Sequence, residues 1–475
     1  LRNLALDSEN RASIASAGAI PQLARQLKDG LPYGQEMAAS ALSQLALKSA
    51  TLRVQVTQEL VGLLGSNLSD VRGRAANALR AMNATHNESM SIAMAGGIDR
   101  FVHLLTHGSV EAQEYALWSL WQSADVASKV SIAEAGCSEP IIATLVAGKL
   151  HEVAKEHAAA VLYFLSSEGV SGVSKELCMK NRQDIEEAGG LIPLISLLRR
   201  GSAGAKRNSA LALAQLAHGE RSTTIAAKGA VTALVEWLID KSCGPPEMAA
   251  HALSYIAQDN TDTQTAIAEE GAIPLLVSMC VSAKNPEWQM YAAGALAALA
   301  ENHVLNQMII YEEGGLKPVV DLLKGEASQP WENATRALWH FSAYYDNKLA
   351  IAKHDGLSPL VRLLSKGSEQ AQEWAAAALE SLTRDCSENQ VANPSVEAIM
   401  PLVGLLGSED EDTQDHAVRA LLNISLPHAD NRNAVVRPIV HLLEVRNAVA
   451  SMKAAQALVM LAARSGADRQ SIAEA

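Results

Sequence analysis

The sequence is poor in aromatic residues, which make up 4% of its 475 residues, although 48% of the residues are hydrophobic. Small and flexible apolar side chains, mainly Ala and Leu, suit close packing of helix on helix better than the core of a β-sheet. The sequence has no uninterrupted apolar run of about 18 residues, the length that would predict a transmembrane helix. No basic-then-apolar segment opens the chain as a signal peptide would. We therefore expect a helical protein that does not insert directly into a membrane.

Paired cysteines and a basic surplus are also lacking. The five cysteines include no Cys-x-x-Cys pair, and they are Cys137, Cys178, Cys243, Cys280 and Cys386. Scattered cysteines predict free thiols, so we expect an intracellular protein in the cytoplasm, with the nucleus as an alternative. The formal charge of −13 argues against nucleic-acid binding, which needs a basic stripe, but it permits a basic partner.

Motifs that carry catalysis or hold a phosphate are absent as well. The sequence contains no GxGxxG, GxxxxGK[ST], HExxH or GxSxG, and no Cys/His spacing that fits zinc. We therefore expect a protein that is not an enzyme and that has no cofactor or metal ion.

What the sequence does contain is a recurring phrase centred on glycine, such as AGAIP at 17–21 and EGAIP at 270–274. The glycines are Gly18, Gly96, Gly136, Gly189, Gly229, Gly271, Gly314 and Gly356. Their spacings are 78, 40, 53, 40, 42, 43 and 42 residues. A period near 42 predicts a helical solenoid, and the first gap spans two periods, so one glycine is missing rather than one repeat.

The segment 270–300 illustrates one repeat. Gly271 can end a short helix in the left-handed conformation, and Pro274 fits the first turn of the next helix. IPLLVSMCV then has apolar residues at helical spacing, SAKNPEW forms a polar turn, and MYAAGALAALAEN predicts a longer helix with small residues. Each repeat is therefore predicted to contain a short, a medium and a long helix.

This pattern resembles the armadillo repeat, and the resemblance covers essentially the whole chain. The phrases that carry it are IAEEGAIPLLVSM and AAGALAALAEN, with IASAGAIPQLARQL and AASALSQLALKS as echoes near the start. The resemblance implies an all-α fold, a right-handed superhelix with three helices per repeat of about 42 residues. In its repeat pattern the chain is similar to armadillo-only scaffold proteins, such as the vacuolar armadillo protein of yeast and the plant armadillo-only proteins. It is not a close match to nuclear-import adaptors.

A leucine recurs in the third helix of each predicted repeat. The eleven leucines are Leu42, Leu79, Leu117, Leu162, Leu213, Leu253, Leu296, Leu338, Leu379, Leu421 and Leu458. We expect one continuous array of about 11 repeats over residues 1–475, with partial repeats at both ends. We also expect the chain to be an excerpt of a longer array. Extra residues at 166–183 predict an inserted loop or a lengthened helix, either neutral or in contact with a partner.

The resemblance implies that the third helices line a concave groove, with one recurring position per repeat in contact with an extended peptide. This ladder position lies two residues after Leu1 and after each of the eleven leucines. It is occupied by Asn3, Gln44, Ala81, Ser119, Phe164, Gln215, Tyr255, Ala298, His340, Ser381, Asn423 and Met460. One turn earlier lie residues that include Asn77, Tyr115, His251, Gly294, Arg336 and Arg419, with no Trp at any of these positions. Nuclear-import adaptors carry Asn and Trp at these places, so the departure predicts a surface specific to another partner.

The residues that we expect in the groove are Gln44, Asn77, Tyr115, Ser119, Phe164, Gln215, Tyr255, Arg336, His340, Ser381 and Asn423, together with Glu111, Glu156 and Glu332. Phe164 and Tyr255 are candidate aromatic anchors, although Phe164 could instead pack under the neighbouring repeat. Two aromatic concentrations, Tyr115–Trp121 and 339–348, are further candidates.

An acidic residue lies six positions before the leucine in seven repeats, at Glu36, Glu111, Glu156, Glu247, Glu332, Glu373 and Asp415. If these side chains face the groove, they favour a basic partner. The alternative is that they lie in the first turn of the third helix, where a negative charge complements the helix dipole.

Taken together, these features predict a non-catalytic scaffold that binds protein partners through basic or extended segments, as part of a larger chain or complex. Two alternatives stay open: the substrate-recognition array of a larger enzyme, such as a U-box ubiquitin ligase, or a structural subunit of a large assembly.

Overall fold

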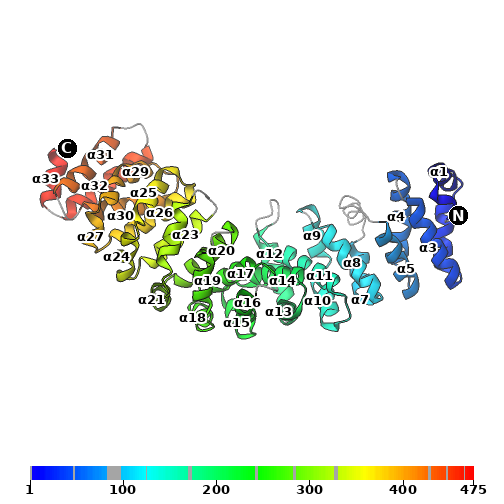
Figure 1. Ribbon diagram of the computed structural model, residues 1–475. Coiled ribbons are helices and arrows are strands. Elements are labelled where there is room, and N and C mark those ends of the chain that lie inside the picture. Colours follow the sequence, from blue (N-terminus) through cyan, green and yellow to red (C-terminus); the bar gives the residue numbers. More distant parts are fainter. Residues whose placement is uncertain are drawn as a thin grey trace. The chain divides into compact units, whose positions relative to one another are not determined.

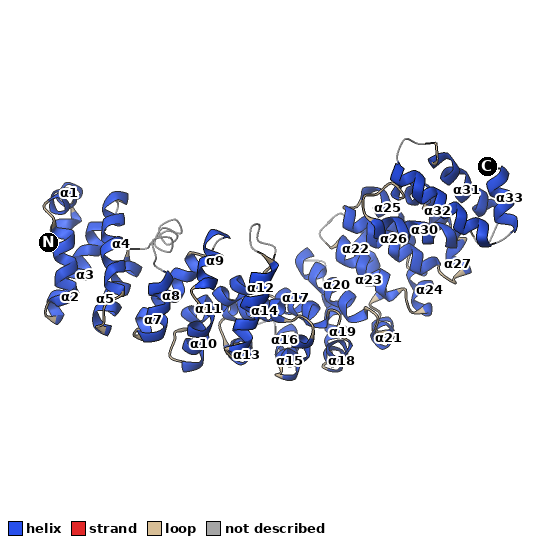
Figure 2. Ribbon diagram, turned by 180° about the vertical axis from the view of Figure 1, so that it is seen from behind, coloured by secondary structure: helices blue, strands red, loops and turns tan. Residues whose placement is uncertain are grey.

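The computed structural model describes residues 3–46, 49–82, 98–124, 126–168, 174–240, 244–281, 285–325, 330–425, 429–444, 448–464 and 466–474. Within these ranges all regular secondary structure is helical, as Figure 2 shows. The predicted all-α solenoid is therefore confirmed. The chain divides into two compact units, Leu1–Leu216 and Ala217–Ala475, which we call unit 1 and unit 2. Whether the array is continuous across both units stays a prediction.

Unit 1 runs from blue to green in Figure 1. Its third helices are α3 (Pro32–Ala46), α5 (Ser69–Ala81), α8 (Val110–Gln122), α11 (Glu152–Ser166) and α14 (Ala203–Leu216). The shorter helices are α1 (Ser8–Ser16), α2 (Ala19–Asp29), α4 (Ala50–Leu64), α7 (Ile98–His107), α9 (Val126–Glu134), α10 (Ser138–Ala147), α12 (Lys175–Glu187) and α13 (Leu191–Arg200). A short 3-10 helix, η1 (Leu4–Leu6), precedes them.

Unit 2 runs from green to red in Figure 1. Its third helices are α17 (Glu247–Ala257), α20 (Pro286–Ala300), α23 (Trp331–Phe341), α26 (Glu369–Thr383), α30 (Glu411–Ile424) and α32 (Ala448–Arg464). Neighbouring members of this series pack directly against one another. The other helices are α15 (Glu220–Ala227), α16 (Ala230–Ile239), α18 (Thr261–Glu269), α19 (Ala272–Val281), α21 (Val304–Glu312), α22 (Leu316–Lys324), α24 (Tyr345–Lys353), α25 (Leu357–Lys366), α27 (Ser387–Gln390), α28 (Asn393–Glu397), α29 (Ile399–Leu405), α31 (Ala429–Leu442) and α33 (Gly466–Glu474).

The recurring glycine has two different roles. Gly271 and Gly314 have φ angles of +79° and +70°, and the left-handed backbone there ends the first helix as expected. In the repeat of Gly356 this conformation is taken by Asp355 instead, with φ +60°. Gly356 has an ordinary φ of −80°, but a Cβ atom at that position would lie 2.6 Å from Cγ2 of Ile351. Glycine is required there because the two helices approach too closely for a side chain.

Two of the predicted irregularities have a structural form. One glycine phrase is missing between Gly18 and Gly96. There α4 continues for 15 residues in place of two helices, and α5 follows as the third helix, so the repeat is present. In the 166–183 segment, α12 has 13 residues, whereas α18, α21 and α24 have nine, so part of the extra sequence lengthens a helix. Residues 169–173 of this segment, and Gly96, lie outside the described residues.

The predicted leucines form part of the hydrophobic core. All eleven lie on third helices, and each is at most 8% exposed. Alanines surround them, so that neighbouring third helices approach closely: in α20, the residues from Ala292 to Ala300 are all buried. The predicted register of the third helices is therefore confirmed.

A second periodic feature runs through the interior. Asparagines in the first helices donate to the last carbonyl groups of the preceding third helix. Four of them are buried and Asn431 is half-buried, and the set is Asn181, Asn306, Asn347, Asn389 and Asn431. At α20, for example, Asn306 Nδ2 lies 2.8 Å from the Leu299 oxygen, and Gln307 Nε2 lies 2.8 Å from the Ala300 oxygen. The last carbonyls of a helix have no partner within the helix, so these amides supply one. We call this set the buried asparagine ladder.

Candidate functional site

In unit 1, some of the predicted groove residues are buried. Tyr115 and Ser119 are each 1% exposed, and Tyr115 packs edge-on against Phe101 with 6.2 Å between ring centroids. Burial also raises the pKa of the Tyr115 hydroxyl. The expectation that these two side chains face a partner is therefore corrected: they belong to the core. Trp121 of the same aromatic concentration is 41% exposed and stacks on His157 at 4.6 Å.

The remaining predicted residues of unit 1 lie nearer the surface. Asn77 and Glu111 are exposed, and Gln44 is half-buried. The Phe164 ring is half-buried, with the ammonium of Lys129 5.2 Å from its centroid. Gln215 accepts a hydrogen bond from Arg182 at 3.3 Å. None of these residues lines the cavity of about 410 Å³ that the described part of unit 1 contains between α7, α8 and α10.

Unit 2 brings predicted residues together. His251 and Tyr255 of α17, Gly294 and Ala298 of α20, and Arg336 of α23 line one cavity of about 330 Å³. Each of these five lies at a ladder position or one turn before it, on three successive third helices. Ser254, Gln258, Tyr291, Glu301 and Asn333 complete the lining. We call this site the Arg336 cavity.

The local sequence makes room for this cavity. Gly294 has no side chain, and a Cβ atom there would lie 3.1 Å from Nδ2 of Asn333 on the facing helix. Asn333 Nδ2 donates to the Met290 oxygen at 2.9 Å, and Arg336 Nη2 donates to the Gly294 oxygen at 3.2 Å. Two polar side chains of α23 thus reach the backbone of α20 through the space that the glycine leaves.

Arg336 dominates the electrostatics of the cavity. Its guanidinium lies 5.6 Å from the centre of the Trp374 ring, and its Nε is buried with no hydrogen-bond partner among the described residues. No carboxylate of the described residues lies within 4.0 Å of it. Burial lowers the pKa of Arg336, while Glu301 acts against this shift. Burial raises the pKa of Glu301 itself, and the nearby Asp259 adds to the shift.

The aromatic side of the cavity is neutral. The His251 ring lies 5.0 Å from Tyr255 and 4.7 Å from Tyr291, and burial lowers the pKa of His251. Farther along α23, burial lowers the pKa of His340 to about 4, with Arg336 contributing. His340 is half-buried and stacks on Trp339. Both imidazoles are therefore uncharged near neutral pH, and Arg336 is the strongest positive charge at the site.

A second group of predicted positions lies farther along unit 2. Arg419, Asn423 and Met460 help to line a cavity of about 470 Å³ between α26, α30 and α32. Asn423 Nδ2 donates to the Glu380 oxygen at 3.1 Å, so its amide is engaged within the fold. The buried Glu380 carboxylate binds His416 at 2.7 Å and also pairs with Arg384. Ser381, beside it, is half-buried.

The acids of the third helices do not share one environment. Glu111, Glu247 and Glu332 lie in the first helical turn, but Glu36, Glu156, Glu373 and Asp415 lie one turn later, so the placement of all seven in the first turn is wrong. Glu332 accepts a hydrogen bond from Ser368 at 2.5 Å, and Glu156 accepts one from Ser202 at 3.3 Å. In both cases the serine hydroxyl also accepts from the N-terminal backbone of the next third helix. These two acids therefore join repeats.

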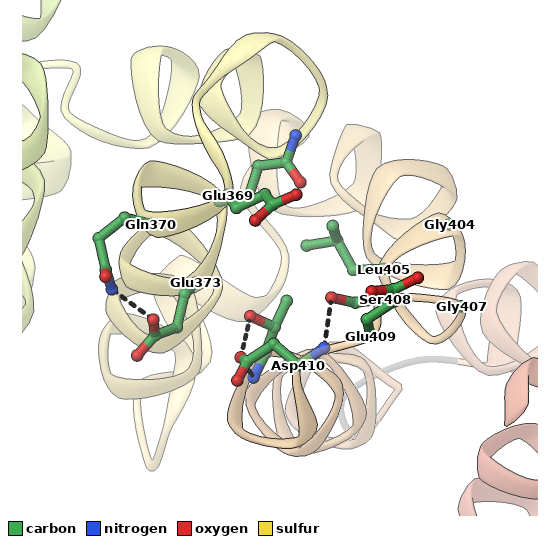
Figure 3. Close-up of a pocket in the computed structure, with 11 residues that line it drawn as sticks. Glu369, Gln370, Glu373, Gly404, Leu405, Gly407, Ser408, Glu409 and Asp410 are labelled. Carbon is green, nitrogen blue, oxygen red and sulfur yellow. Dashed lines mark hydrogen bonds between the residues drawn. The ribbon is translucent and has the colours of Figure 1, made fainter. Parts of the chain in front are cut away.

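Glu373 faces a different pocket, shown in Figure 3, of about 600 Å³ at the N-terminal ends of α26 and α30. Glu369, Glu409 and Asp410 also line it, so four carboxylates surround one opening. Burial raises the pKa of Glu373, and the Asp410 charge acts in the same direction. Asp410 accepts from the Thr413 backbone at 2.7 Å as the N-cap of α30.

Within the described residues, no group of three His, Cys, Asp or Glu side chains is arranged to hold a metal ion. Among the helices that the structure describes, none is both long and apolar enough to cross a membrane.

Sequence reasoning missed four contributors to these sites: Tyr291, Glu301, Trp374 and Glu380. All four lie outside the aligned positions, and Glu301 lies just past the end of α20. Glu380 directly follows an aligned leucine, where an acid in a buried position was an available signal.

Comparisons with known proteins agree with this architecture. The model of the armadillo/β-catenin-like repeat matches residues 7–47, 89–122 and 345–384. The solved structure of an engineered protein is 28% identical, covers 85% of this chain and 98% of its own, and has a TM-score of 0.70. Another engineered protein is 29% identical over 50% of this chain and 96% of its own, with a TM-score of 0.45. The comparison with curated proteins finds no match. The repeat period, the three-helix units and the three matched segments together show that the chain contains armadillo repeats.

Proposed function

We propose that this protein is a non-catalytic scaffold that binds an extended segment of a partner protein along the third helices of unit 2. The observation that carries the proposal is the lining of the Arg336 cavity. Residues predicted from sequence spacing alone, on three successive repeats, converge there on one opening. A row of such positions suits an extended chain, because each repeat presents side chains at a regular distance from the last.

The composition of this surface supports recognition of a partner. Tyr255, Tyr291, Trp374 and Arg336 belong to the residue types that contribute most to binding energy at protein interfaces. The half-buried aromatic rings offer apolar contact to a partner. The Arg336 guanidinium beside them has N–H donors, unused among the described residues, for directional hydrogen bonds.

The expectation of a basic partner segment is part of this proposal, and the pocket of Figure 3 supports it. Four carboxylates around one opening repel each other, and a Lys or Arg side chain placed there would relieve that repulsion. We also propose an intracellular location, supported by four free and buried cysteines among the described residues.

The test is a selection from a random dodecapeptide library displayed on phage, with the full chain as bait. Selected peptides are then measured against Tyr255→Ala and against Tyr311→Ala, which removes a 45% exposed tyrosine from the first helix α21. We expect Tyr255→Ala to weaken binding at least about tenfold and Tyr311→Ala to leave it unchanged. Enrichment of Lys or Arg, lost in a Glu369→Gln/Glu409→Gln variant, would support the basic segment.

The proposal would be contradicted by selected peptides that bind the two tyrosine variants equally, or by a failure to select any peptide. Circular dichroism of both variants shows whether each keeps its helical content, so that a loss of binding is not a loss of fold.

A further inference from the structure

We propose that the Arg336 cavity is a subsite for a carboxylate group of the bound segment, supplied by an Asp or Glu side chain. This inference rests on the proposed function, and it names the chemistry that one position of the partner must have.

The first argument is the hydrogen-bonding capacity of Arg336. A guanidinium carries five N–H groups. The described structure gives it one acceptor, the neutral carbonyl of Gly294 at 3.2 Å, and leaves Nε without a partner. A carboxylate accepts two parallel hydrogen bonds from a guanidinium, which matches the unused donors.

The second argument is charge. Elsewhere on or beside the third helices of unit 2, cations are paired: Arg384 and Arg419 with Glu380, and Lys453 with Asp415 at 2.9 Å. Arg336 has no carboxylate within 4.0 Å among the described residues, although burial disfavours its charge. An unpaired and partly buried cation is costly, and an incoming anion would offset that cost.

The third argument is the shape and polarity of the surroundings. The cavity of about 330 Å³ accommodates one side chain, and its walls include Tyr255 and the neutral His251. Because Trp374 covers one face of the guanidinium, a ligand must approach from the cavity side or along the edge. A single guanidinium and no second cation in the lining favour a singly charged carboxylate over a doubly charged phosphate.

Glu301 sharpens the test because it lines the same cavity and carries the opposite charge. If the ligand group is a carboxylate, Glu301 repels it, and Glu301→Gln should strengthen binding. If the ligand group is a cation or a backbone amide that donates to Glu301, the same substitution should weaken binding. The sign of this one change therefore distinguishes the occupants.

The experiment uses the phage-displayed random dodecapeptides and the full chain. We expect the selected peptides to share an Asp or Glu at one position. Replacement of that residue by Asn or Gln should weaken binding at least about tenfold in wild type and little in Arg336→Gln. Arg336→Gln should lose the acidic preference, whereas Glu301→Gln should bind the same peptide several-fold more tightly.

Two further arms locate the source of the carboxylate. Amidation of the peptide C-terminus should leave the affinity unchanged if a side chain is bound, and it should abolish binding if the terminal carboxylate is bound. The latter outcome overturns the assignment to a side chain.

Failure of this inference differs from failure of the proposed function. Peptides that depend on Tyr255 but show no acidic preference, or that bind Glu301→Gln more weakly, overturn the carboxylate subsite and leave the scaffold intact. Peptides that are insensitive to both Tyr255→Ala and Arg336→Gln overturn both.

Discussion

The buried asparagine ladder predicts a large local effect from one small substitution. Asn306 is 1% exposed, and its Nδ2 donates to the oxygens of Leu299 at 2.8 Å and Gln264 at 3.3 Å. Asn306→Ala removes both bonds and leaves the Leu299 carbonyl, at the end of α20, without its side-chain partner. Each neutral hydrogen bond contributes about 1 kcal/mol net, and a buried carbonyl without a partner costs about 1–3 kcal/mol. We therefore expect a loss of about 2 kcal/mol in the free energy of opening around α20 and α21.

Hydrogen–deuterium exchange read by mass spectrometry is the appropriate assay, because global unfolding of a long repeat array is not a two-state process. A loss of about 2 kcal/mol accelerates exchange about 30-fold in peptides from α20 and α21, since 1.36 kcal/mol corresponds to one factor of ten. Leu305→Ala is the matched control: this neighbour on the same helix is 65% exposed, so we expect an effect within about 0.5 kcal/mol. Equal exchange in the two variants would refute the capping role of the ladder.

Two other predictions concern the stability of unit 2. Gly356→Ala should lower the midpoint of urea unfolding more than Gly314→Ala. Overpacking against Ile351 costs about 1–3 kcal/mol and the new Cβ would lie 2.6 Å from Ile351, whereas a left-handed alanine costs about 1–2 kcal/mol and meets no neighbour within 4 Å at Gly314. The reverse order would contradict the two roles assigned to these glycines. Burial lowers the pKa of His340 to about 4, so the unfolded chain binds this proton at higher pH than the folded chain does. The contribution of His340 is therefore complete above about pH 6.5 and is lost as pH falls toward 4. His340→Gln should reduce the loss of stability between pH 7 and pH 5 by about 1–2 kcal/mol, measured by urea titrations at both values, and an unchanged difference would contradict the assignment.

Much of the fold could be predicted because it depends on short-range patterns. The glycine phrase and the leucine register place every third helix, and all eleven leucines are buried as expected. The exchange of roles between Asp355 and Gly356 could not be predicted, since either residue tolerates the left-handed conformation. Only the distance between Ile351 and the neighbouring backbone distinguishes them.

The ladder spacing identifies some of the residues that line the Arg336 cavity and misses others. Tyr255 and Arg336 lie where the ladder spacing places them, and the same rule applied to Tyr115 points to a side chain that the structure buries. Tyr115 turns into the core because Phe101, on a different helix, offers an edge-on contact. Glu301 lines the cavity and Trp374 lies against the Arg336 guanidinium, and neither residue is at a ladder position or one turn before it.

Local spacing determines which residues share one side of a helix, because 3.6 residues per turn and a period near 42 are properties of the chain itself. It therefore determines the repeat family, the third-helix register and the ladder positions. Burial, pairing and charge depend on groups in neighbouring repeats, such as Arg336 and the Gly294 carbonyl 42 residues earlier, or Glu156 and the space left by Gly204. Those contacts form only when neighbouring repeats pack together, and for that reason the unpaired state of Arg336 is decided by the tertiary structure.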